Sequence, residues 1–103
     1  MTITEIKKKR KGLSGLYIDY EFALDIDTET LLSHRIDVGT DIDDEKLREL
    51  IDHSNIKRAK DKAMWLISYR DHSSKELYDK LRKDYSEEAA QNALQRMQEL
   101  GLI

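Results

Sequence analysis

The sequence has no cysteine and no proline, and its 103 residues include only four glycines, one tryptophan and one phenylalanine. The lack of cysteine excludes disulfide bonds and thiolate metal ligands. The lack of proline leaves no proline-rich linker that would separate domains. No apolar run reaches the roughly 18 residues of a membrane-spanning helix, so we expect no membrane partner. The length predicts one compact domain, or two very small modules in contact.

An excess of basic charge is also missing. Lys and Arg together number 18 and Asp and Glu number 21, which gives a net charge of −3. The stretch 59–103 carries equal numbers of basic and acidic residues. Such a protein has no global basic field that would attract nucleic acid, so contact with phosphates would need a local patch.

The stretch 59–103 has the pattern of three short helices in series. Apolar residues recur at helical spacing over 59–67, with Trp65 and Tyr69 widening or bordering that face. Ser73 and Glu76 form a Ser-x-x-Glu capping box, in which each side chain is expected to bond the other residue's backbone N–H. Helices this short are unstable alone in water, so the three must share a core.

Two further signals mark the start and the end of the third helix. Ser86 is a second N-cap and is followed by acidic residues, which the helix dipole favours in a first turn. Gly101 occupies the position after a helix where glycine is common. The predicted core residues of the second and third helices are Leu77, Leu81, Ala90, Ala93, Leu94 and Met97.

The N-terminal part predicts an antiparallel β hairpin, with residues 2–9 paired to residues 16–26. Apolar residues alternate with polar ones along 16–26, which is typical of a half-buried strand and places Tyr17 on the wet face. The basic run 7–11 and the glycines of 12–15 predict the connecting turn. The second strand is long enough to bend or break near Glu21 and Phe22, and a third short strand stays open as an alternative.

Short helices are expected between the hairpin and residue 59. Asp27 is a candidate N-cap for the first, and Gly39 marks a turn before an acidic helix start at 41–44. We expect a break at 53–55, with Ser54 or Asn55 capping the next helix. The predicted fold is therefore α+β. Residues 1–53 form a β hairpin with short helices, and residues 54–103 form a three-helix repeat.

No catalytic constellation is visible. Two acidic stretches, 25–36 and 41–52, begin like calcium loops but lack the glycine at position six and the glutamate at position twelve. The histidines are scattered and no His-Glu-x-x-His pattern occurs, and His72 beside the capping box is predicted to lie at the surface. We expect no enzyme, no bound metal, no cofactor and no small-molecule substrate.

Two basic groups are candidates for contact with phosphates or an acidic protein. The run 7–11 is interpreted as a solvated turn, with phosphate contact as the alternative. Around the second helix of 59–103 a plain solvated face competes with a partner-binding patch. Aromatic residues of this region could stack on bases, but at helical spacing they are predicted to belong to the core or its edge. The candidate partner-binding residues are Arg70, Lys75, Lys80, Arg82 and Lys83.

Three segments carry a family resemblance: YRDHSSKEL at 69–77, LRKDYSEEA at 81–89 and LGLI at 100–103. In this register they resemble the first helical repeat of the RecX family, bacterial regulators of the RecA recombinase. The strand pair and short helix before them look like the N-terminal extension of RecX proteins from low-GC Gram-positive bacteria. Asp84 stands where that family usually has glycine, so a strained left-handed turn is expected there.

The resemblance implies a non-enzymatic, cytoplasmic regulator of homologous recombination, DNA repair and the SOS response. It implies binding to the RecA filament, with DNA phosphates within or beside it, and inhibition of the RecA ATPase and recombinase. The family continues with two further three-helix repeats, so the chain is expected to be an N-terminal fragment. The rival hypothesis is a small helical DNA-binding module that acts through a basic helix face, with salt-dependent binding to bare DNA.

Overall fold

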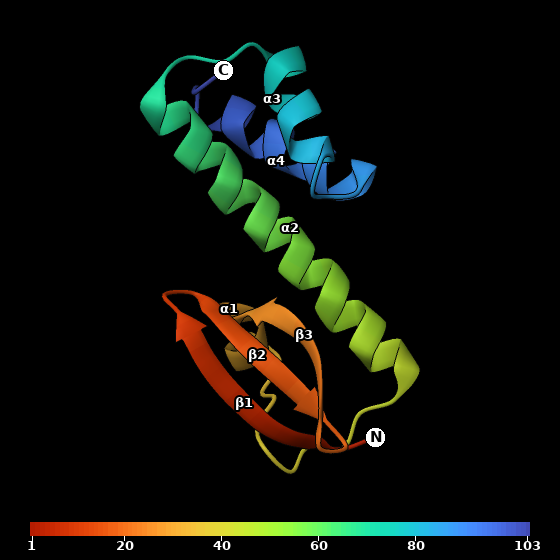
Figure 1. The fold of residues 1–103 in the computed structure, drawn as a ribbon. Helices are drawn as coiled ribbons and strands as arrows, with labels where there is room; N and C mark the ends of the chain where they lie inside the picture. Colours follow the sequence, from red (N-terminus) through yellow and green to blue (C-terminus); the bar gives the residue numbers. More distant parts are fainter. The chain divides into compact units, whose positions relative to one another are not determined.

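A computed structural model describes residues 1–103, which divide into two compact units, Met1–Ser54 and Asn55–Ile103. Three antiparallel strands precede four helices (Figure 1), which confirms the predicted α+β class. One helix, α2, runs through the boundary, and each unit is described by itself. The elements are β1 (Ile3–Arg10), β2 (Leu13–Ile18), β3 (Glu21–Asp27), α1 (Thr28–Ser33), α2 (Asp44–Tyr69), α3 (Ser74–Arg82) and α4 (Glu87–Glu99).

The sheet has the order β1-β2-β3, so the predicted second strand is in fact two strands. The chain reverses at Asp19 and Tyr20, whose φ angles of 50° and 69° lie in the left-handed region used by tight hairpin turns. A register shift follows, because Leu16 pairs with Leu24 whereas Tyr17 pairs with Phe22. This single extra residue turns Phe22 to the wet face, where half of its surface is exposed.

The sequence had suggested that the basic run 7–11 forms the connecting turn, but most of it does not. Lys7 to Arg10 lie within β1, which is an edge strand, and the turn is confined to positions 11 and 12. Gly12 there has a φ of 79°, which glycine adopts without steric cost. All five basic side chains are exposed. Charges along an edge strand oppose its pairing with other chains.

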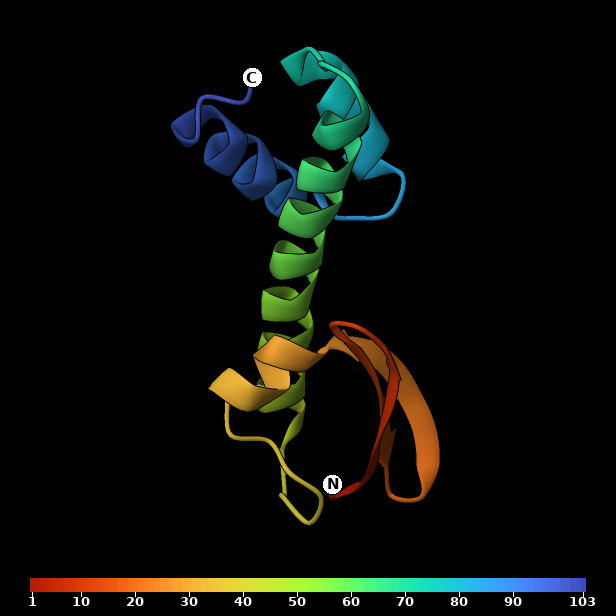
Figure 2. The ribbon, with the colours of Figure 1, turned by 90° about the vertical axis from the view of Figure 1, so that its left-hand side faces the viewer.

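Unit 1 encloses its core between the sheet and two helical segments. Figure 2 shows α1 and the first turns of α2 on one side of the curved sheet. Asp27 caps α1 as predicted, since its carboxylate accepts from the Thr30 backbone N–H at 2.9 Å. Gly39, with a φ of 95°, makes the predicted turn. The buried core residues are Ile3, Leu16, Ile26, Leu31, Ile36, Ile42 and Leu50.

The expected break at 53–55 is wrong, because α2 is continuous from Asp44 to Tyr69. Ser54 caps nothing. Its side chain is buried, and its hydroxyl accepts a hydrogen bond from the Asp27 backbone N–H at 2.8 Å. The hydroxyl therefore serves a contact between α2 and the end of β3, while the backbone of α2 stays helical.

Unit 2 packs α3 and α4 with the second half of α2. The Ser73 hydroxyl accepts from the Glu76 backbone N–H at 3.1 Å, and the Ser86 hydroxyl accepts from that of Ala89 at 3.2 Å, so both predicted caps are confirmed. Gly101 ends α4 with a φ of 72°. The core residues are Ala59, Ala63, Leu77, Leu81, Ala89, Ala90, Ala93, Leu94 and Met97.

Candidate partner-binding surface

The basic residues predicted around the second helix of 59–103 lie on and beside α3. Three of them, Lys75, Lys80 and Lys83, line one shallow hollow together with Ser73, Glu76 and Asp79. The other two, Arg70 and Arg82, do not line it. The sequence patch is thus divided into a group of three lysines and two separately held arginines.

Arg70 forms an ion pair with Glu76. Its guanidinium donates to both carboxylate oxygens of Glu76, one of them at 3.1 Å, and to the Asp71 carbonyl oxygen at 3.0 Å. These hydrogen bonds hold the pKa of Glu76 down at about 2 and raise the pKa of Arg70. Glu76 therefore does not complete the capping box by bonding the Ser73 N–H, because its carboxylate is turned to Arg70 instead.

His72 is buried, which corrects the prediction of a surface position. Its Nδ1 lies 2.9 Å from the Arg70 carbonyl oxygen, and its Nε2 lies 3.0 Å from the Lys80 ammonium. An ammonium can only donate, so Nε2 accepts from Lys80 and Nδ1–H donates to the carbonyl oxygen. His72 therefore holds the Lys80 ammonium in place, and Glu76 lies 3.8 Å from the same ammonium.

Lys75 and Lys83 are the least constrained cations of the set. The side chain of Lys75 is 89% exposed and reaches only one acidic partner, Asp79, at 3.9 Å. Lys83 is exposed at the C-cap of α3. Arg82 is turned toward the following loop, where it donates to the Tyr85 carbonyl oxygen at 2.8 Å. Cations placed near a helix C-terminus also complement the helix dipole.

Asp84 does not adopt the strained left-handed backbone that its place in the motif suggested. The non-glycine residues with positive φ are Asp19, Tyr20 and Arg35. The Asp84 carboxylate instead accepts from the Lys62 ammonium of α2, and this hydrogen bond lowers the pKa of Asp84. An ordinary turn, tied to α2 by an ion pair, therefore replaces the expected glycine-type turn.

The aromatic residues of unit 2 fall into two groups. Tyr78 and Tyr85 pack against the core, as predicted. Trp65 and Tyr69 do not, because 56% and 71% of their surfaces are exposed. Their rings meet edge to face, with centroids 4.9 Å apart. The last turns of α2 thus present an aromatic pair to solvent that the helical spacing alone did not reveal.

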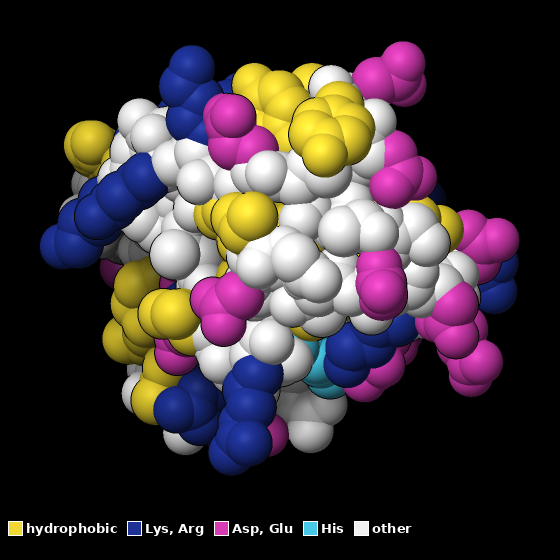
Figure 3. All heavy atoms as spheres, turned by 90° about the horizontal axis from the view of Figure 1, so that it is seen from below, with side chains coloured by type: hydrophobic (Ala, Val, Ile, Leu, Met, Phe, Trp, Pro, Cys, Tyr) yellow, Lys and Arg dark blue, Asp and Glu magenta, His cyan; other side chains and the backbone are white.

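Charge is mixed on the surface of this protein. Figure 3 shows one face, on which Lys and Arg side chains stand in separate groups between Asp and Glu side chains. No helix is both long enough and apolar enough to cross a membrane. Around α3, Lys75, Lys80 and Lys83 likewise stand beside Glu76 and Asp79, so this surface can contact an acidic group through a few lysines, without a broad basic field.

The family model for the RecX first three-helix domain matches residues 59–97. The chain is 33% identical over 104 residues to the regulatory protein RecX of Clostridium beijerinckii, an alignment that covers 100% of this chain and 49% of the relative. It is 35% identical over 105 residues to the RecX of Caldanaerobacter subterraneus, covering 100% of this chain and 53% of the relative. This chain is thus similar over its whole length to part of these RecX proteins, and residues 59–97 match the family's first three-helix domain.

A solved structure agrees on the fold. The crystal structure of a regulatory protein RecX matches with a TM-score of 0.74 and 24% identity, over 99% of this chain and 51% of that chain. At this identity the match shows that the two share a fold. Both RecX sequences above are named regulatory proteins, and this chain spans about half the length of the relatives it matches.

Proposed function

We propose that this chain belongs to the RecX family and is part of a non-enzymatic regulator that binds the RecA filament and inhibits its ATPase and recombinase activity. The match of residues 59–97 to the first three-helix domain of the family is the observation that carries the proposal. In this view unit 2 is the first of several helical repeats, and unit 1 is an extension that precedes it. The partner is a protein filament, with DNA phosphates inside or beside it.

The proposed contact lies on α3. Lys75 and Lys83 are both exposed, and Lys75 makes only a long ion pair with Asp79, so contact with an acidic partner would cost few existing interactions. Lys80 contributes its charge from a position fixed by His72. Arg70 and Arg82 already bond Glu76 and a backbone carbonyl, so they are proposed to shape the surface and to contact the partner less directly.

The test measures RecA ATPase activity on single-stranded DNA as this protein is added. Wild-type protein is expected to slow ATP hydrolysis, and a Lys75→Glu/Lys83→Glu variant is expected to need a higher concentration for the same effect. Arg96→Glu is the matched control, because Arg96 is an exposed cation of α4 in the same unit. Equal inhibition by all three proteins would remove α3 from the interface. No inhibition by any of them would count against the proposal itself.

Direct binding to bare DNA is the second candidate, and the edge strand favours it. Lys7, Lys8, Arg10 and Lys11 are exposed on or beside β1, where a phosphate backbone could lie along them. Neutralising several phosphates would give binding that weakens steeply with salt, with a log–log slope of about −0.9 per phosphate contact on duplex DNA. Measurable binding without RecA, lost in a Lys8→Glu/Arg10→Glu variant, would favour this function over the first.

A further inference from the structure

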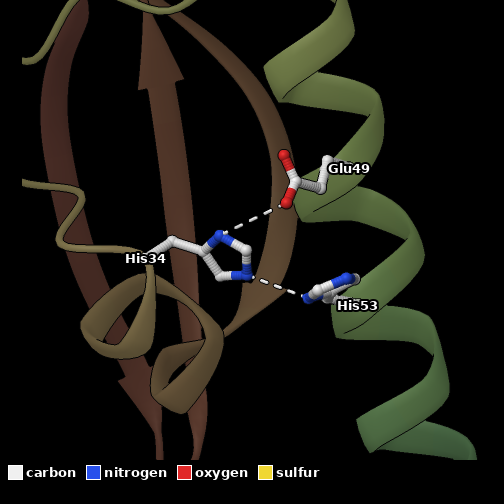
Figure 4. A group of neighbouring side chains, drawn as sticks. All are labelled: His34, Glu49 and His53. Atoms are coloured by element: carbon white, nitrogen blue, oxygen red, sulfur yellow. Dashed lines mark hydrogen bonds and ion pairs between the residues drawn. The ribbon is translucent and has the colours of Figure 1, made fainter.

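Unit 1 holds a group of potential metal ligands that neither the family motif nor the surface on α3 includes. His34 lies at the C-cap of α1, and Glu49 and His53 lie one turn apart on α2. One ligand atom from each of these three side chains lies within 4.8 Å of the others. Figure 4 shows the His34 ring between the Glu49 carboxylate and the His53 ring. Residues 19 positions apart in the sequence are thus brought to one point.

Only one nitrogen of His34 can bind a given ion, and one ligand atom from each residue lies within 4.8 Å of the others, which is wider than a coordination sphere. His34 Nε2 lies 2.9 Å from His53 Nδ1, and His34 Nδ1 lies 4.0 Å from Glu49 Oε1. In a tetrahedral zinc site, bonds of about 2.0–2.1 Å place neighbouring ligand atoms about 3.3 Å apart. Small side-chain rotations, on the order of 1 Å at the ligand atoms, would make the three groups converge on one ion.

The two imidazoles already have the protonation state that metals require. The Lys46 ammonium lies 2.9 Å from His34 Nδ1 and can only donate, so Nδ1 accepts and Nε2–H donates to His53 Nδ1. Both rings are therefore neutral in this hydrogen-bonded chain, and neutral imidazole is the form that binds metal.

The donor set indicates the class of ion. Two imidazole nitrogens and one carboxylate oxygen suit Zn²⁺ and the similar divalent ions Co²⁺, Ni²⁺ and Cu²⁺, whereas Ca²⁺ and Mg²⁺ prefer oxygen ligands alone. Three protein ligands leave a further position for water, as in open zinc sites. We propose that His34, Glu49 and His53 form a binding site for a zinc-type divalent metal that fastens the end of α1 to α2.

Lys46 competes with the metal in this site. If the ion takes Nδ1 of His34, it displaces the ammonium directly. If it takes Nε2, the ring proton moves to Nδ1, which then cannot accept from Lys46. In both cases the hydrogen bond from Lys46 to His34 is lost on binding. Removal of the ammonium by Lys46→Met is therefore expected to strengthen metal binding, which a merely structural histidine pair would not show.

The experiment titrates tag-free protein with ZnCl₂ in a calorimeter, and with Co²⁺ while its visible absorption is followed. One equivalent of metal is expected to bind, with NMR shifts at the rings of His34 and His53 and none at His72. His53→Asn and Glu49→Gln should each weaken binding by more than the roughly 10–100-fold that is lost when a residue hydrogen-bonded to a metal ligand is removed. Asp52→Asn is the matched control, because Asp52 is an exposed acidic neighbour outside the group.

Lys46→Met should bind more tightly than wild type, with Lys75→Met as the charge control in the other unit. Amide spectra of every variant establish that it is folded before the titrations are compared. Absence of binding at millimolar Zn²⁺ would overturn the site. So would binding that folded His53→Asn and Glu49→Gln retain unchanged, or ring shifts confined to His72.

Discussion

Replacing Ser54 by alanine tests the buried contact between α2 and the end of β3. The Ser54 hydroxyl accepts from the Asp27 backbone N–H at 2.8 Å, and only 2% of Ser54 and 4% of Asp27 is exposed. Without the hydroxyl this buried N–H has no partner, which costs about 1–3 kcal/mol. Alanine favours the helix over serine by up to about 0.5 kcal/mol. The expected net loss in the free energy of unfolding is about 0.5–2.5 kcal/mol.

Two measurements follow the Ser54→Ala change. Urea unfolding monitored by far-UV circular dichroism gives the loss of stability, and amide hydrogen exchange reports on the Asp27 N–H itself. Ser68→Ala is the matched control, because Ser68 lies in the same helix but is exposed. The control should keep or slightly raise stability through helix propensity alone. Equal stability of the two variants, with the Asp27 amide still protected, would refute the reasoning.

Three further predictions concern both units. Leu81→Ala, at a fully buried position of unit 2, should lower the free energy of unfolding in urea by about 2–5 kcal/mol. Leu32 is 72% exposed, so Leu32→Ala should lower it little. Similar losses for the two variants would contradict the assigned core. The pKa of Glu76 falls from 4.5 unfolded to about 2 folded, so its contribution is complete above pH 4.5 and is lost as pH falls through 2. A carboxyl NMR titration should show this, and Arg70→Gln should move the Glu76 pKa back up; no movement would exclude the Arg70 pair as the cause. Asp84→Gly should lower the melting temperature, because no positive φ is relieved and an ion pair is lost; a rise would indicate hidden backbone strain.

Local signals in the sequence predicted much of the fold. The caps at Asp27, Ser73 and Ser86 and the glycines at 39 and 101 depend on neighbours within a few positions, so their residue types suffice to predict them. The three-helix pattern of 59–103 is likewise a property of spacing along one face. The resemblance to RecX proteins, noted from three short segments, is confirmed by the comparisons.

The predictions that the structure contradicts concern residues whose contacts are made with residues distant in the sequence. Ser54 resembled a cap, but its hydroxyl bonds Asp27, which lies 27 residues earlier. Phe22 is one of the alternating apolar residues of 16–26, but one extra residue in β3 turns its side chain to the wet face. His72 was predicted to lie at the surface, but it is buried and bonds the Lys80 ammonium of α3. Tertiary contacts of this kind leave no periodic signal in the sequence.

The candidate sites show the same limit. The five basic residues around α3 could be identified from the sequence. The ion pair between Arg70 and Glu76 could not. The spacing of Glu49 and His53, four residues apart on one helix, was a readable signal that they share a face. The proximity of His34 to these two side chains could not be predicted from the sequence, because it depends on how α1 packs beside α2 within unit 1.

The most direct test of the central claim is binding to RecA filaments assembled on single-stranded DNA with a slowly hydrolysed ATP analogue. The protein is labelled, and its anisotropy is followed with filaments and, separately, with the same DNA alone. Saturable binding to filaments, little binding to bare DNA, and weaker filament binding by Lys75→Glu/Lys83→Glu than by Arg96→Glu are expected. Equal binding to bare DNA, or no binding to filaments, would contradict the account.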